Sequence, residues 1–249
     1  MINHIHKIIF IHISKCAGTS VEKAFGIDHL DNTETNNSNL FGWNQKHGLH
    51  LQHATPQQLL DYGFVSKQEW ETYYKFVIVR NPYGRAVSDY FYIIKDSGYI
   101  DSFKNYIYKR GKFKTILNDN SCIRYRGDHL NIQKEYFFLN GEEVTYDLVI
   151  RMENIKDGFE KLKQDLKLTD DFFDVHSKKG IKKFRHYSVF YNIYRKQLVY
   201  KKFKTDFQFF NYSYCNKKNL FETLKAVCPS VFFVPLKYWK KYIKSMFNK

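Results

Sequence analysis

A short segment, residues 15–20, carries several groups that bind anions. Lys15 supplies a positive charge, and Thr19 and Ser20 supply hydroxyl donors. Gly18 lets the backbone approach a ligand closely. The segment lies at the start of a predicted helix, where free N–H groups and the helix dipole favour negative charge. It predicts a site for a phosphate or a sulfate; the alternative is an ordinary strand-to-helix turn with a solvated lysine.

Arg80 and Ser88 form a second pair of anion-binding groups. Arginine can bind a phosphate through two parallel hydrogen bonds. Ser88 lies about two turns into a helix whose first turn contains Pro82, and its hydroxyl can donate toward the same group. The alternative is an arginine at a strand edge and a serine in a helix packing seam.

Two histidines are candidates for a general base, because imidazole titrates near neutral pH. His53 ends a predicted short strand, residues 49–53, just before a helix that Thr55 caps and Pro56 opens. In an open α/β sheet, active sites gather at such strand ends. His12 precedes Lys15 and is either the competing base or a core group. Taken alone, a single histidine is more often structural or solvated.

Two apolar segments are predicted to position these groups. Residues 7–13 and 73–80 have the composition of buried strands in a parallel sheet. A helix is expected from residues 21–25, capped by Thr19 or Ser20, and an amphipathic helix at residues 153–166.

Length and charge limit the possible functions. The chain has 249 residues, which suits one large domain or a domain with an appendage. Its formal net charge of +15 favours anionic ligands. Its four cysteines lack CxxC spacing, and its N-terminal apolar run is too short for a signal peptide. We therefore expect a cytoplasmic location, at most peripheral at the inner membrane face. No nucleic-acid module is recognised, so no nucleic-acid partner is expected.

Several motifs carry a resemblance to a known family. FIHISKCAGTS, residues 10–20, is similar to the 5′-phosphosulfate loop of sulfotransferases, and IVRNPYGRAVSDYF, residues 78–91, resembles their 3′-phosphate motif. The greatest similarity is to sulfotransferase family 2, which includes heparan sulfate 2-O-sulfotransferases and related carbohydrate sulfotransferases. Further similar segments are QHAT, DLVIRMENI and YKKFKTDFQFFNY, which begin at Gln52, Asp147 and Tyr200.

The resemblance extends to about residue 214 but is absent across roughly residues 96–145, and two positions depart from the family pattern. Ser14 stands where the family often has proline, and Gly84 stands where an acidic residue is common. Neither change removes a group expected to touch the cofactor. We therefore expect a sulfotransferase domain at residues 1–214 and a basic, aromatic helical extension at residues 215–249.

The resemblance implies a P-loop-like three-layer α/β fold with a central, mainly parallel sheet flanked by helices. It also implies transfer of a sulfuryl group from 3′-phosphoadenosine 5′-phosphosulfate (PAPS) to a carbohydrate hydroxyl, without a metal, leaving 3′-phosphoadenosine 5′-phosphate (PAP). Lys15 would stabilise the leaving phosphate, and His53 would act as general base. The expected cofactor-binding residues are Lys15, Cys16, Ala17, Gly18, Thr19, Ser20, Arg80 and Ser88.

The acceptor site is less defined by the sequence. Arg124, Arg126 and His12 are candidates for binding an anionic or lipid-linked sugar, although Arg124 and Arg126 equally suit a solvated basic loop. A second basic loop, residues 178–185, is either a lid over the phosphates or a solvated segment.

Residues 236–247 have the pattern of a basic amphipathic helix, with apolar residues at helical spacing. Such a helix can lie on an anionic membrane, or it can dock on the domain or on a partner chain. Two functions other than sulfuryl transfer also stay open. The chain could be a non-catalytic nucleotide- or polyanion-binding protein. It could also be a nucleotide-dependent phosphotransferase, although the GxxxxGK[ST] order of that class is missing.

Overall fold

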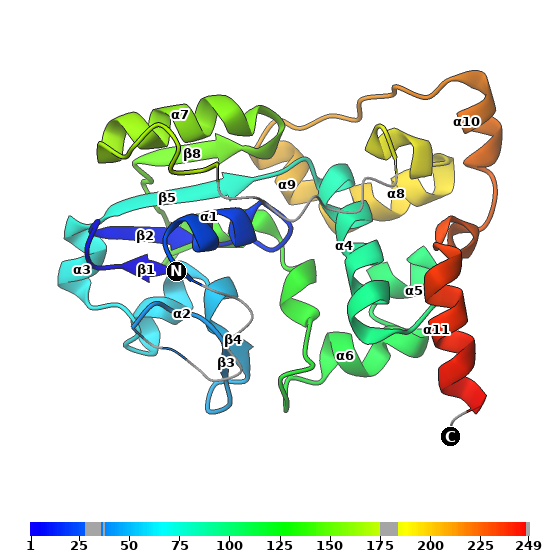
Figure 1. Cartoon of the computed structure of the whole chain (residues 1–249), viewed down its shortest axis with the longest axis horizontal. Helices are drawn as coiled ribbons and strands as arrows, with labels where there is room; N and C mark the ends of the chain where they lie inside the picture. The colour runs from blue at the N-terminus through cyan, green and yellow to red at the C-terminus, as the bar shows by residue number, and fades with distance from the viewer. Residues whose placement is uncertain (28–35, 37, 175–183, 248–249) are drawn as a thin grey trace. The chain divides into compact units, whose positions relative to one another are not determined.

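A computed structural model describes residues 1–27, 36, 38–174 and 184–247. The chain forms two compact units (Figure 1). The first comprises Met1–Arg80 and Asn131–Ile181, and the second comprises Asn81–Leu130 and Lys182–Lys249.

The first unit is built around a four-stranded sheet with the order β1-β2-β5-β8. Its strands are β1 (Ile2–Asn3), β2 (Ile8–Ile11), β5 (Tyr74–Val79) and β8 (Leu148–Arg151). β2, β5 and β8 run parallel, and only β1 is antiparallel. All four residues of β2 and the last four of β5 are buried, as their continuous apolar sequences predict. The expected mainly parallel sheet is therefore confirmed.

Helices α1 (Gly18–Ala24), α2 (Pro56–Asp61), α3 (Lys67–Thr72) and α7 (Ile155–Leu166) belong to the same unit and flank its sheet (Figure 1). α7 packs closely on β8. A Cβ added at Gly158 would lie only 2.3 Å from Ile150 Cγ2. The expected cap of α2 is confirmed. Thr55 accepts the Gln58 backbone N–H, and the Gln58 side chain accepts the Thr55 N–H.

The prediction of a strand at residues 49–53 is wrong beyond His50, where β4 (Leu49–His50) ends. Among the residues that the structure describes, β4 pairs only with the two-residue β3 (Trp43–Asn44), and no ladder continues beyond it. The chain turns into a 3₁₀ helix, η1 (Leu51–His53), and Leu51 N–H bonds the Gly42 carbonyl. A second small hairpin joins β6 (Phe138–Leu139) to β7 (Glu142–Glu143).

In the part of the second unit that the structure describes, the regular elements are helical. They are α4 (Pro82–Ser97), α5 (Phe103–Ile107), α6 (Lys114–Asn118), α8 (Ile193–Lys202), α9 (Lys204–Phe209), α10 (Leu220–Lys225) and α11 (Leu236–Phe247), with short 3₁₀ turns such as η2 (Gly111–Phe113), η6 (Tyr187–Phe190) and η7 (Ser230–Phe233). The start of α4 at Pro82 and the helix at 236–247 are confirmed. α5 has only five residues, and α8 and α9 are separated at Phe203.

Aromatic side chains form the core of the second unit. Tyr90, Phe103, Tyr106 and Phe190 are fully buried and pack edge to face or tilted. The buried Arg195 guanidinium stacks over Phe190 and donates to the carbonyls of Phe190, Ala226 and Cys228. Its bonds tie the C-terminal residues to this core. Among the described residues, no helix has the length and apolarity needed to cross a membrane.

Candidate active site

The loop between β2 and α1 has an unusual backbone. Lys15 has a φ of 66° and Ala17 a φ of 62°, both in the left-handed region. This conformation costs a non-glycine residue roughly 1–2 kcal/mol, and such strain is concentrated at functional sites. Left-handed residues beside right-handed ones also turn consecutive N–H groups toward one concavity, which can bind an anion.

The loop leaves backbone donors available. Ala17 is the N-cap of α1 and makes no side-chain cap bond, so the predicted cap by Thr19 or Ser20 is wrong. Both residues instead lie inside the first turn of α1. Among the described residues, the backbone N–H groups of Ala17, Gly18 and Thr19 donate to no protein acceptor. This end of α1 therefore presents three amide donors beside Lys15.

Arg80 and Gln133 fix the loop to the end of β5. The Arg80 guanidinium donates to the Lys15 carbonyl at 3.1 Å. The Gln133 side-chain amide accepts from Arg80 N–H at 2.9 Å and donates to the Arg80 carbonyl at 2.8 Å. Gln133 is fully buried, and Cys16 Sγ lies 3.7 Å from its Oε1. The first unit thus holds the two predicted cations, Lys15 and Arg80, next to each other.

A buried histidine–glutamate pair packs against the loop. His12 Nδ1 lies 2.7 Å from Glu22 Oε1, and both side chains are almost completely buried. A Cβ on Gly18 would approach His12 Nε2 to 1.8 Å. Glycine is therefore needed at position 18, because the imidazole occupies the space of a side chain. His12 is also stacked on Phe10, with ring centroids 5.6 Å apart.

His53, at the end of η1, lies beside His12. Their ring centroids are 4.8 Å apart and nearly perpendicular. The His53 carbonyl accepts a hydrogen bond from Tyr136 at 3.1 Å, which fixes the backbone that carries the imidazole. His50 extends the group, with its ring 6.2 Å from that of His53. The two histidines proposed as competing bases are thus neighbours in one unit.

Comparison with protein families identifies the family of the chain that carries this loop. Residues 1–213 match the family model described as "Sulfotransferase family", Sulfotransfer_2. The chain belongs to the sulfotransferase family. The searches of curated proteins and of solved structures gave no significant match. The P-loop-like α/β fold and the family named by the sequence motifs are both confirmed.

Other predicted sulfotransferase site residues lie in the second unit. Ser88 is half-buried on α4, and its pairing with Arg80 stays a prediction. Arg126 donates to Asp96 at 3.0 Å and to two backbone carbonyls, so its guanidinium already has a structural role. Arg124 is exposed. The role of both arginines in acceptor binding stays a prediction, and most of the proposed lid, residues 178–183, lies outside the described residues.

Two residues that lie beside the predicted site residues were missed in the sequence. Gln133 lies within the stretch that carries no family motif, and its contacts with Cys16 and Arg80 span 117 and 53 positions. Glu22, in contrast, could have been identified from the sequence. It follows Gly18 by four residues, so the two share one helix face, and an acidic residue on a face that turns toward a strand needs a buried partner.

Proposed function

We propose that this sulfotransferase uses PAPS to sulfate a hydroxyl of a carbohydrate: a polysaccharide, a glycan or a glycolipid. One observation carries the proposal: the loop of a sulfotransferase-family chain holds Lys15 and Ala17 in left-handed conformations and presents unbonded amides at the start of α1. Strain of this kind is retained when a ligand uses the resulting geometry.

The donor set fits an anionic nucleotide. Amide N–H groups, hydroxyls and the cations of Lys15 and Arg80 are all donors, and the nearby Glu22 carboxylate is buried against His12. The proposed ligands of the nucleotide are Lys15, Cys16, Ala17, Gly18, Thr19, Ser20, Arg80 and Ser88. When bound, PAPS would supply the sulfuryl group and a phosphate leaving group.

Lys15 and the loop amides would stabilise negative charge that grows during transfer. Donors fixed before the reaction lower the barrier more than mobile ones, because no reorganisation is needed. The bond from Arg80 to the Lys15 carbonyl and the bonds from Gln133 to Arg80 supply that rigidity. Arg80 and Ser88 would set the position of the nucleotide through its 3′-phosphate.

His53 would accept the proton of the acceptor hydroxyl. General base catalysis typically contributes about 10²–10⁴-fold. The neighbouring His12 pairs through Nδ1 with Glu22, and this pair would hold His12 as a fixed wall against which the His53 ring packs. His12 is the second candidate for the base and for contact with the acceptor.

The test is an assay of PAP release and of product mass, with PAPS and a panel of glycosaminoglycan, neutral polysaccharide and glycolipid acceptors in buffer containing EDTA. We expect sulfated product with wild type and a loss of at least ~100-fold with Lys15→Ala. Lys23→Ala is the matched control, because it removes the same charge from the other end of α1.

Two outcomes would contradict the proposal. PAP binding without product on any carbohydrate acceptor would favour a nucleotide-binding protein without catalysis. A strict requirement for Mg²⁺, with phosphate rather than sulfate transferred, would favour a phosphotransferase.

A further inference from the structure

Large apolar side chains are exposed on the segment that follows the sulfotransferase match. Together they are here named the C-terminal surface: Leu220, Phe221, Leu224, Val227, Phe232 and Leu236. Each is between 65% and 80% exposed, and all lie beyond residue 213, where the family match ends. Single exposed apolar residues are ordinary, but contiguous ones mark an interaction site.

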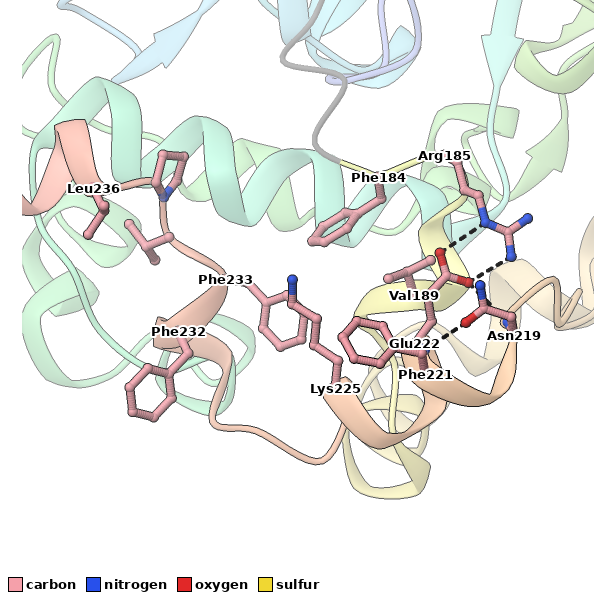
Figure 2. Close-up of a pocket in the computed structure, with 12 residues that line it drawn as sticks. Phe184, Arg185, Val189, Asn219, Phe221, Glu222, Lys225, Phe232, Phe233 and Leu236 are labelled. Carbon is pink, nitrogen blue, oxygen red and sulfur yellow. Dashed lines mark hydrogen bonds and ion pairs between the residues drawn. The ribbon is translucent and has the colours of Figure 1, made fainter.

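Several members of the C-terminal surface lie around one hollow (Figure 2). Phe221, Phe232 and Leu236 line a groove of about 590 Å³, together with the more buried Phe233. Leu220 and Leu224 are four residues apart on α10 and so share a helix face. Half of the C-terminal surface thus borders one groove, and Leu220 and Leu224 lie together on α10.

This segment is held firmly on the second unit. Arg195 donates to the carbonyls of Ala226 and Cys228, and Ala226 is almost fully buried. At the N-terminus of α10, Asn219 and Glu222 form a capping box. Phe233 and Val234 are buried. The segment is therefore folded and buries one set of its apolar residues. The other set is exposed because it lies on the outer side of this folded segment.

Helix α11 also exposes apolar side chains, and it adds lysines beside them. Tyr238 and Tyr242 share one face and are half-buried, and Lys112 Nζ lies 4.5 Å from the Tyr242 ring centroid. Leu236 and Ile243 lie on the other side, where both are exposed. At 100° per residue, this outer side also carries the exposed Lys237, Lys240 and Lys244.

The net charge of this C-terminal segment indicates what kind of partner it can bind. Residues 214–249 contain eight lysines and a single acidic residue, Glu222. Glu222 is paired with Arg185 at 2.7 Å, and this contact lowers the pKa of its carboxyl to about 2. The surface is thus strongly basic at neutral pH. A second copy of the chain would bring the same charge to the contact, which opposes self-association.

We propose that the C-terminal surface and the outer side of α11 dock this protein peripherally on an anionic lipid bilayer. The apolar side chains would enter the boundary between headgroups and acyl chains, and the lysines would lie among the anionic headgroups. No helix among the described residues can span a bilayer, so the contact is interfacial. The inference does not depend on the proposed catalytic activity.

The test is co-sedimentation of the full chain with vesicles of phosphatidylcholine alone or mixed with phosphatidylglycerol. We expect binding to the anionic vesicles only. The variant Phe221→Ser/Phe232→Ser/Leu236→Ser should lower the partition coefficient at least tenfold. The variant Lys237→Gln/Lys240→Gln/Lys244→Gln should lower it about 100-fold.

Matched controls remove equally exposed groups elsewhere. Ile5→Ser/Ile193→Ser takes away two of the most exposed apolar side chains outside the surface, and Lys67→Gln/Lys104→Gln/Lys201→Gln removes three exposed lysines. Both should keep most of the wild-type binding. Because every substituted side chain is at least partly exposed, circular dichroism should show all variants folded.

Three results would overturn the proposal: wild type that stays in solution with anionic vesicles, equal binding to neutral vesicles, or undiminished binding by both surface variants. Sedimentation velocity without lipid tests the alternative that a second copy of the chain covers this surface. A wild-type dimer that the apolar variant abolishes, with no vesicle binding, would assign the surface to contact between copies.

Discussion

Replacing Gly18 with alanine tests whether His12 occupies the space beside the first turn of α1. The new Cβ would lie 1.8 Å from His12 Nε2 and 2.1 Å from two ring carbons. The imidazole cannot move aside cheaply, because Glu22 holds it at 2.7 Å and Phe10 stacks on it. Overpacking of this kind typically costs about 1–3 kcal/mol. For a chain of this length, we expect Tm to fall by roughly 2–12 °C.

The effect of Gly18→Ala on stability should change sign when the imidazole is absent. The background is His12→Ala/Glu22→Leu, which removes the ring and also avoids leaving the Glu22 carboxylate buried without it. In that background the clash is gone, and alanine should stabilise the protein by about 0.5–1 kcal/mol, because Gly18 begins α1 without a positive φ and alanine restricts the unfolded chain. The coupling between the sites is therefore about 1.5–4 kcal/mol.

The assay is thermal and urea unfolding of four proteins, followed by circular dichroism: wild type, Gly18→Ala, the background, and the background with Gly18→Ala. A Gly18→Ala protein within ~1 °C of wild type would refute the steric argument. An equal loss in both backgrounds would show that alanine is harmful for a reason other than His12.

Three other predictions use single contacts of the structure. Gln133→Leu should lower Tm by roughly 4–10 °C in thermal unfolding, because it leaves the Arg80 N–H and carbonyl without their buried partner; a loss no larger than that of the exposed Gln68→Leu would contradict this. His53→Ala should reduce turnover about 10²–10⁴-fold in the sulfate-transfer assay while PAP affinity is kept, and near-normal turnover would move the base to His12. Burial, with Lys217 and Arg185, lowers the pKa of His186, whose Nδ1 accepts the Ser188 N–H. The unfolded state therefore binds more protons below pH ~6.5, and stability should fall as pH decreases through that region. His186→Asn keeps the acceptor but cannot titrate, so its Tm should depend less on pH between about 8 and 5; an unchanged dependence would exclude His186.

The fold was predictable where local sequence and tertiary structure agree. The apolar run before Arg80 forms β5, and Asn81-Pro82 begins α4, because asparagine caps and proline fits a first turn. Thr55-Pro56 opens α2 for the same reason.

The parts that were not predicted depend on tertiary contacts. Residue propensities do not anticipate left-handed Lys15 and Ala17, so the start of α1 was placed too late and its cap was misassigned. β4 ended early because its partner strand has two residues. Gln133 could not be found, because its partners are distant in sequence.

The central claim is that the loop and Arg80 bind a 3′-phosphoadenosine nucleotide. Isothermal titration with PAP in metal-free buffer tests it most directly, with wild type, Lys15→Ala, Arg80→Ala and the control Lys23→Ala. The account predicts binding by wild type and by Lys23→Ala, and at least ~10-fold weaker binding by the other two, since each loses a charge-assisted contact worth about 1.5–3 kcal/mol. A folded wild type that does not bind PAP, or equal weakening by Lys23→Ala, would contradict it.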